Sequence, residues 1–164
     1  MKMVYFVRHA KSSWEDHTLR DKDRPLNKRG KRDAPFMANL MKEKGVQPDL
    51  IISSPANRAY TTACHFAAAF GIEAVDIQKE ENIYEAYETA VLTIIQSLAN
   101  SHQTIFVFGH NPSFTSLANL FTTNYIDNVP TCGIVQVAAA IEDWKNFGAD
   151  TGKLVAFHYP KQYF

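Results

Sequence analysis

Met3-Val4-Tyr5-Phe6-Val7-Arg8-His9 is the stretch that decides how this chain folds. The apolar run from Met3 to Val7 is typical of a strand that is covered on both faces of a sheet. This strand ends in an always-charged guanidinium and a titratable imidazole, and burying such groups is costly unless a partner is present. A phosphoryl group suits both, because arginine binds its oxygens bidentately and a neutral histidine can attack phosphorus.

Length, charge and cysteine content indicate an ordinary globular protein. The 164 residues suffice for one hydrophobic core, so residues 1–164 are predicted to form a single domain. The 17 basic and 17 acidic residues cancel to a formal net charge of zero. Cys64 and Cys132 lack the CxxC spacing of a zinc site or redox pair, and free thiols fit a cytoplasmic location.

No part of the sequence predicts targeting or membrane insertion. The N-terminal apolar run is too short for a signal peptide, and it ends in Arg8-His9 instead of a small-residue cleavage site. No stretch approaches the roughly 20 apolar residues of a membrane span. We therefore expect a cytoplasmic protein without a membrane partner.

Basic residues are concentrated at the start of the chain. Residues 1–32 hold ten basic side chains and four acidic ones. Such a segment attracts anions, although a solvated basic face is the alternative interpretation. Exposed aromatic residues are not interleaved with these charges and no nucleic-acid motif is present, so we expect no nucleic-acid partner.

Strand and helix signals alternate along the chain. The predicted strands are Val4–Val7, Asp49–Ser53, Ala74–Gln78, Thr104–Phe108, Ile134–Ala140 and Leu154–Tyr159. The predicted helices are Leu26–Lys44, Ser54–Phe70, Ala86–Asn100 and Asn111–Phe121. This alternation predicts a three-layer α/β/α sandwich with a mostly parallel central sheet.

Helix boundaries are predicted from capping residues, prolines and glycines. Asn27 is expected to cap the first helix, and Pro35 predicts either a kink or a helix that begins only there. Ser54-Pro55 and Asn111-Pro112 each resemble a cap followed by proline at the first helical position, and Gly71 is expected to end the second helix.

Three pairs of residues lie where predicted strands end: Arg8-His9, Ser53-Ser54 and Gly109-His110. Ligands of parallel α/β sheets bind beyond the carboxyl ends of the strands. These pairs are therefore expected to meet in one site. His9 is predicted to be a nucleophile, because nearby arginine charges would keep its imidazole neutral; a structural histidine is the alternative.

Arg58 lies in the first turn of the predicted second helix. A guanidinium beside a positive helix N-terminus is unfavourable until an anion arrives, so Arg58 is a candidate phosphate ligand or else a surface side chain. His110 precedes the helix opened by Asn111-Pro112, where backbone N–H groups around Ser113 and Phe114 can bind an anion. We expect His110 to donate to phosphate oxygens, with Asn111 in the same binding set.

Glu85 is the candidate general acid for the leaving group, if desolvation raises its pKa. A capping carboxylate is the equally supported alternative. His9 and His110 also suggest a metal site, but Arg8 and Arg58 would repel a divalent cation and no carboxylate pair accompanies them. No metal is therefore expected.

Four motifs together resemble the histidine phosphatase superfamily, which is phosphoglycerate mutase-like. They are Val7-Arg8-His9-Ala10-Lys11-Ser12-Ser13-Trp14, Asp23-Arg24-Pro25-Leu26, Ser53-Ser54-Pro55 with Arg58-Ala59 and Thr62, and Gly109-His110-Asn111-Pro112. Within the superfamily the chain is most similar to the small SixA-type phosphohistidine phosphatases. The resemblance implies a phosphoenzyme mechanism without metal or organic cofactor: His9 accepts the phosphoryl group, Arg8, Arg58 and His110 hold its oxygens, and water hydrolyses the intermediate. Glu85 matches the position of the proton donor in many members.

The chain departs from the commoner family pattern at two points. Ala10 replaces the glycine of an Arg-His-Gly signature, as in SixA-like members, and no sizeable insertion after Ser54–Thr62 caps the pocket. An open site of this kind can admit a phosphorylated side chain from another protein. We therefore predict a protein phosphohistidine phosphatase. The alternatives are a broad-specificity phosphomonoesterase acting on small phosphate esters and a non-catalytic phosphate-binding regulatory module.

Overall fold

A six-stranded mixed sheet forms the centre of the molecule in the computed structural model, which describes residues 1–164. The strand order is β3-β2-β4-β1-β5-β6. The first four of these strands run parallel, and β5 and β6 are each antiparallel to the preceding neighbour. The strands are β1 (Lys2–Arg8), β2 (Leu50–Ser53), β3 (Gln78–Lys79), β4 (Thr104–Gly109), β5 (Ile134–Ala139) and β6 (Gly152–His158).

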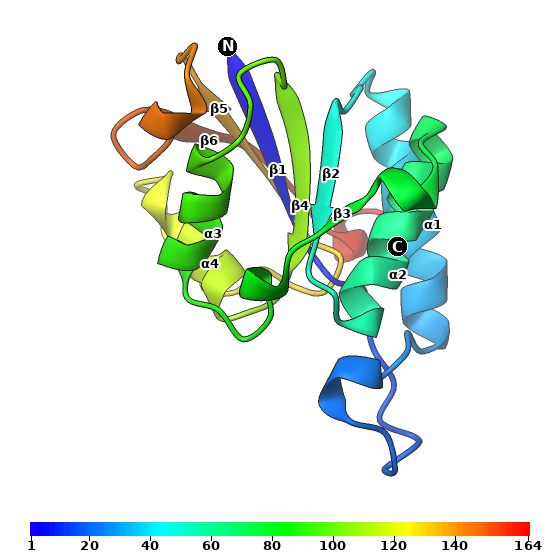
Figure 1. Cartoon of the computed structure of the whole chain (residues 1–164). Coiled ribbons are helices and arrows are strands. Elements are labelled where there is room, and N and C mark those ends of the chain that lie inside the picture. The colour runs from blue at the N-terminus through cyan, green and yellow to red at the C-terminus, as the bar shows by residue number, and fades with distance from the viewer.

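Helices cover both faces of this sheet, with α1 and α2 on one face and α3 and α4 on the other (Figure 1). The helices are α1 (Lys28–Glu43), α2 (Asn57–Phe70), α3 (Glu88–Gln96) and α4 (Ser113–Leu120). The predicted three-layer α/β/α sandwich is confirmed. None of these helices combines the length and apolar composition that crossing a bilayer requires.

Strand β1 shows why the opening apolar run decides the fold. Val4 and Phe6 pack with the core beneath α3 and α4, whereas Tyr5 and Val7 pack with the core beneath α1 and α2. Successive side chains of a strand point to opposite faces, so a strand between two helical layers needs apolar residues at every position. Pairing with β4 and β5 on either side places β1 inside the sheet.

Helix α1 begins directly after its predicted N-cap, Asn27, two residues later than the predicted range Leu26–Lys44. The Asn27 side chain accepts a hydrogen bond from Gly30 N at 2.9 Å, which confirms the predicted N-cap. The helix runs through Pro35 from Lys28, so the alternative of a start at Pro35 is wrong. Proline inside a helix costs about 3 kcal/mol, and burial of the face that carries Met37 and Met41 offsets this cost.

The predicted starts of α2 and α4 are wrong. Helix α2 begins at Asn57 with Ala56 at the N-cap, because the Ser54 hydroxyl instead accepts from Ala56 N at 3.2 Å within the preceding turn. Helix α4 begins at Ser113, and Asn111 Oδ1 accepts from Thr115 N at 3.2 Å. The predicted end of α2 is confirmed, since Gly71 adopts a left-handed conformation with φ 73°.

The segment around β3 and α3 also differs from prediction. Ala74–Asp76 forms a 3-10 turn, and only Gln78–Lys79 pairs with β2, so the predicted strand Ala74–Gln78 is wrong. Helix α3 is shorter than the predicted Ala86–Asn100. Beyond the end of α3, the Asn100 carbonyl accepts a hydrogen bond from the buried Lys2 ammonium, and the Asn100 side chain accepts one from Trp144 N. These bonds join distant segments, so helical periodicity in the sequence does not predict them.

Candidate active site

The strands β1, β2 and β4 are parallel, so their carboxyl ends bring three predicted site segments together. These ends lie at the bottom of the sheet in Figure 1. Arg8 is in register with Gly109, and Ser53 with Phe108. A cavity of about 160 Å³ lies at these ends. Its lining includes Arg8, His9, Arg58, His110 and Asn111, together with Lys11, Ser12, Trp14, Arg24 and Thr131.

His9 is buried at this cavity with its imidazole in a defined tautomer. Its Nδ1 lies 2.8 Å from the Ala10 carbonyl oxygen. Because a carbonyl only accepts hydrogen bonds, Nδ1 carries the proton and Nε2 keeps a free lone pair. Burial, followed by the charges of His110, Arg58 and Arg8, lowers the pKa of His9 to about 3, although the Ala10 hydrogen bond opposes this. His9 is therefore neutral near pH 7.

Thr62 of helix α2 holds the backbone that follows His9 in place. Ala10 N donates to Thr62 Oγ1 at 3.0 Å, and the Thr62 hydroxyl donates to the Arg58 carbonyl at 2.7 Å. The same helical turn therefore positions both the backbone next to His9 and the residue that carries a pocket guanidinium. Thr62 is completely buried, so this link is shielded from water.

Arg58 is oriented by Asp21, a residue that the sequence analysis does not single out for the site. Arg58 Nη1 donates to the Asp21 carbonyl at 2.8 Å, and Nη2 donates to the Asp21 carboxylate at 3.0 Å. Burial raises the pKa of Asp21, but hydrogen bonds from Tyr84 and Arg58 outweigh it and lower the pKa to about 2. The carboxylate is therefore ionised and cannot serve as a general acid near neutral pH.

Arg24 is a third arginine at the cavity, and the sequence analysis assigns it no site role. Its Nη1 donates to Ser12 Oγ at 2.8 Å, and its Nε donates to the Asp21 carboxylate at 3.2 Å. The Trp14 ring stacks on the guanidinium, 3.5 Å from its central carbon. The motif Asp23-Arg24-Pro25-Leu26 is the sequence signal that could have identified Arg24 as a site residue.

Arg8 and His110 also contribute polar side chains to the lining of the cavity. Arg8 Nη1 donates to the Val129 carbonyl at 3.0 Å, and burial, then the Arg58 charge, lowers the pKa of Arg8. His110 Nε2 lies 2.8 Å from Ser54 Oγ, and the His9 and His110 ring centroids are 5.3 Å apart. Burial, then Arg58, lowers the pKa of His110 to about 4.

Unpaired polar atoms are concentrated among the residues that line this cavity. Four buried side-chain nitrogen or oxygen atoms lack a hydrogen-bond partner, and three of them are Arg8 Nε, Arg58 Nε and His110 Nδ1. Leaving a buried polar group unpaired costs about 1–3 kcal/mol, so such groups are normally satisfied. Their concentration around one cavity indicates a site for a ligand rich in hydrogen-bond acceptors.

Asn111 lines the cavity but has no side-chain donor left for a ligand. Its Nδ2 donates to Asn128 Oδ1 and to the Val129 carbonyl, both at 3.0 Å. Its Oδ1 accepts from the Thr115 backbone and hydroxyl. The predicted anion site at the N-terminus of α4 is also partly occupied, because Phe114 N donates to the His110 carbonyl at 3.0 Å. Asn111 therefore braces the loops that carry Arg8 and His110.

Glu85 is not among the residues that line the cavity. Its side chain is exposed, so it lacks the desolvation on which the general-acid prediction depends, and its backbone has φ 54°. The adjacent Tyr84 lies closer to the site: its hydroxyl donates to the Asp21 carboxylate at 2.7 Å, and its ring centroid is 5.6 Å from that of His110.

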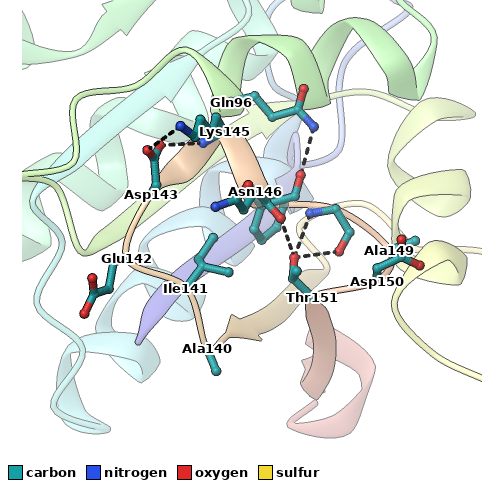
Figure 2. Close-up of a pocket in the computed structure, with 12 residues that line it drawn as sticks. Gln96, Ala140, Ile141, Glu142, Asp143, Lys145, Asn146, Ala149, Asp150 and Thr151 are labelled. Atoms are coloured by element: carbon teal, nitrogen blue, oxygen red, sulfur yellow. Dashed lines mark hydrogen bonds and ion pairs between the residues drawn. The ribbon is translucent and has the colours of Figure 1, made fainter.

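A larger cavity lies at the other end of the strands, beside the loop from β5 to β6 (Figure 2). It measures about 760 Å³ and contains none of the predicted site residues. Several of its polar groups already pair within the lining: Lys145 with Asp143, Gln96 with the Phe147 carbonyl, and Thr151 with the Asn146 and Gly148 carbonyls. We therefore assign the chemistry to the smaller cavity around His9.

The fold is that of the phosphoglycerate mutase-like class of proteins. Residues 4–88 match the family model described as histidine phosphatase superfamily (branch 1). The chain belongs to this superfamily, and its overall structure is of the SixA type. It superimposes with a TM-score of 0.82 on a structure from Agrobacterium tumefaciens described as a SixA phosphohistidine phosphatase, at 28% identity over 97% of this chain and 98% of that one.

Two curated relatives extend this comparison. An uncharacterised chloroplastic protein of Arabidopsis thaliana is 31% identical over 169 residues, covering 92% of this chain and 72% of the relative. Phosphoserine phosphatase 1 of Hydrogenobacter thermophilus is 36% identical over 89 residues, covering 52% of this chain and 39% of the relative. The resemblance therefore spans nearly the whole chain in the first case and about half of it in the second.

Proposed function

We propose that this phosphatase removes the phosphoryl group from phosphohistidine on a protein, through a covalent intermediate at His9. Nε2 of His9 forms a bond to phosphorus as the bond from phosphorus to the substrate imidazole breaks. The substrate imidazole leaves with a proton from solvent. Water then attacks the His9 phosphohistidine, which releases inorganic phosphate and restores the neutral imidazole.

Electrostatics support this assignment. Arg8, Arg24, Arg58 and Lys11 line the cavity, and no carboxylate is among its lining residues. Donors preorganised around a reacting phosphoryl group are each worth roughly 10²–10³ in rate. The same guanidiniums would repel a divalent cation, so the proposed reaction uses the arginines and His110 to hold the phosphoryl oxygens.

The observation that carries the substrate assignment is that the cavity has no carboxylic acid. An alkoxide leaving group needs a general acid, whereas an imidazole with a pKa of about 6.5 leaves readily once it is protonated by solvent. Glu85 lies outside the cavity lining and Asp21 is held ionised. The site is therefore better suited to breaking a phosphorus–nitrogen bond than a phosphate ester bond.

Hydrolysis of small phosphomonoesters is the second candidate. It is supported by the similarity of about half of the chain to phosphoserine phosphatase 1 and by a cavity that is open to solvent. The two candidates differ in leaving group, and a direct comparison of substrates separates them.

The test compares a ³²P-phosphohistidine protein with phosphoserine and p-nitrophenyl phosphate. We expect kcat/KM to be highest for phosphohistidine, and an alkaline quench, in which phosphohistidine survives, to trap ³²P on the enzyme. His9→Ala should abolish both turnover and trapping, whereas His17→Ala, in an exposed loop, should leave both unchanged. A preference for the esters would favour the second candidate, and failure to trap label with any donor would contradict the intermediate.

A further inference from the structure

A second cavity adjoins the active site and shares one residue with it. The second cavity measures about 290 Å³, and Thr131 lines both. Its charged lining residues are Arg29, Arg32, Asp33 and Lys161. The Thr131 side chain therefore lies on the boundary between the catalytic cavity and a basic groove that no step of the proposed chemistry uses.

Close packing of α1 keeps this groove beside the catalytic cavity. A Cβ added to Gly30 would lie 2.2 Å from the Lys11 carbonyl oxygen, so the first turn of α1 rests directly on the Lys11 backbone. Asn27 N donates to the same oxygen at 2.9 Å. Since Lys11 lines the catalytic cavity, the residues beside Gly30 are held close to it.

A buried carboxylate organises the two arginines. Asp33 is 1% exposed, and its Oδ1 accepts from Arg32 Nε at 2.9 Å while its Oδ2 lies 3.7 Å from Arg29 Nε. Arg29 Nη2 also donates to Thr131 Oγ1 at 3.1 Å. Both arginine side chains are still about half exposed, at 50% and 52%. Their guanidiniums are thus fixed on the protein side and open to a ligand on the other.

Lys161 adds a third cation without any internal partner. It follows β6, is exposed, and forms no side-chain hydrogen bond or ion pair. The groove is lined by three cationic side chains and one buried side-chain carboxylate, so these side chains carry net positive charge. Tyr159, Pro160 and Phe164 supply apolar surface beside these charges, and Arg32 stacks on the Phe164 ring at 4.1 Å.

We propose that this groove binds acidic side chains in the polypeptide segment that flanks the phosphohistidine of a protein substrate. The inference rests on the proposed function and identifies what selects the substrate. Fixed guanidiniums suit carboxylates, which they can bind bidentately, and the adjoining apolar residues suit a peptide backbone. Continuity through Thr131 allows one segment to place its phosphoryl group at His9 and its acidic residues in the groove.

The test uses two synthetic phosphohistidine peptides that differ only in whether the flanking positions are Asp and Glu or Ala, with phosphoimidazole as a substrate that lacks any peptide. We expect the wild-type protein to prefer the acidic peptide about tenfold in kcat/KM, and the preference to shrink as salt rises. Lys161→Glu should remove the preference while leaving the rates on the Ala peptide and phosphoimidazole within twofold of wild type.

Lys153→Glu is the matched control, because Lys153 is an exposed lysine near the start of β6, the strand that Lys161 follows. It should retain the preference. Equal rates on the two peptides with the wild-type protein, or a preference that survives Lys161→Glu, would overturn the groove proposal. Failure of the wild-type protein to hydrolyse phosphoimidazole or either peptide would instead contradict the proposed function, so the two failures are distinguishable.

Discussion

Arg58 binds Asp21 at two points: Nη1 donates to the backbone carbonyl at 2.8 Å and Nη2 donates to the carboxylate at 3.0 Å. The same carboxylate accepts from Arg24 Nε at 3.2 Å. One acidic residue thus positions two guanidiniums of the proposed phosphoryl-binding cavity. Asp21 stays outside the cavity lining and acts through the arginines.

Asp21→Ala should lower kcat/KM about five- to tenfold, because Arg58 and Arg24 lose an anchoring carboxylate bond worth about 1 kcal/mol at this partly exposed position. Steady-state kinetics with phosphoimidazole checks this, and Asp21→Asn should recover part of the loss. Asp23→Ala is the control, since Asp23 pairs only with the exposed Arg20. Unchanged or higher kcat/KM in Asp21→Ala would show that the carboxylate only weakens the positive field.

The His9 imidazole should be neutral and protonated at Nδ1 throughout the physiological pH range. The reasons are its bond to the Ala10 carbonyl and a pKa that burial and neighbouring cations lower to about 3. Long-range ¹H–¹⁵N NMR of the histidine rings measures both properties, with His9→Gln to assign the signal. A resonance that titrates near pH 6.5, or a proton on Nε2, would contradict the proposed nucleophile.

Acidification below pH 6.5 should destabilise the fold. The folded pKa values of His9 and His110, about 3 and about 4, lie below the unfolded value of about 6.5. Between these limits the unfolded chain binds more protons, so the free energy of unfolding falls as pH falls, by up to about 1.4 kcal/mol per pH unit for each histidine. Urea titrations at pH 7, 6 and 5 should show a shallower slope for His110→Gln than for wild type. Parallel slopes would refute the lowered pKa of His110.

Gly30→Ala should destabilise the protein by about 1–3 kcal/mol, because the new Cβ meets the Lys11 carbonyl oxygen at 2.2 Å and backbone must move. This corresponds to a fall in Tm of about 2–12 °C for a chain of this size. Gly148→Ala is the control, since no atom lies within 4 Å of its added Cβ. Thermal unfolding followed by circular dichroism compares them, and equal Tm values would contradict the close packing of α1.

Phosphate or vanadate binding should change the fluorescence of Trp14 and not that of Trp144. Trp14 is 64% exposed at the cavity and stacks on Arg24, whereas Trp144 is fully buried and bonds to the His102 carbonyl before the start of β4. Titration of Trp14→Phe should show no change, and Trp144→Phe should respond as wild type does. A signal that persists in Trp14→Phe would place the anion elsewhere.

The sequence predicts the sheet well, and also that Arg8, His9, Arg58 and His110 lie together, because these signals are local. An apolar run without polar interruptions indicates a strand covered on both faces, and Val4, Tyr5, Phe6 and Val7 are all buried as this requires. Parallel strands share a carboxyl edge, so Arg8-His9 and Gly109-His110 had to come together once β1 and β4 paired. The location of Arg58 beside this site is predicted because Arg58 lies in the first turn of α2.

Contacts between distant segments are what the sequence did not predict. Asp21 is 37 residues from Arg58 and 63 from Tyr84, and no periodicity links them. Ser54 is a good capping residue by type, yet its hydroxyl lies beside His110 and α2 starts later. Glu85 has the right chemistry for an acid and the wrong surroundings, because its exposure is set by the fold around it.

By itself, the order of residues determined the alternation of strands and helices, the central place of β1 and the set of polar groups at the strand ends. These follow from backbone periodicity and from the cost of burying charge. Only the tertiary structure decided which groups pair, which tautomer His9 adopts, and that Arg24 and Asp21 join the site. Hydrogen bonding and desolvation depend on distances of a few ångströms between segments far apart in the chain, and those distances exist only after packing.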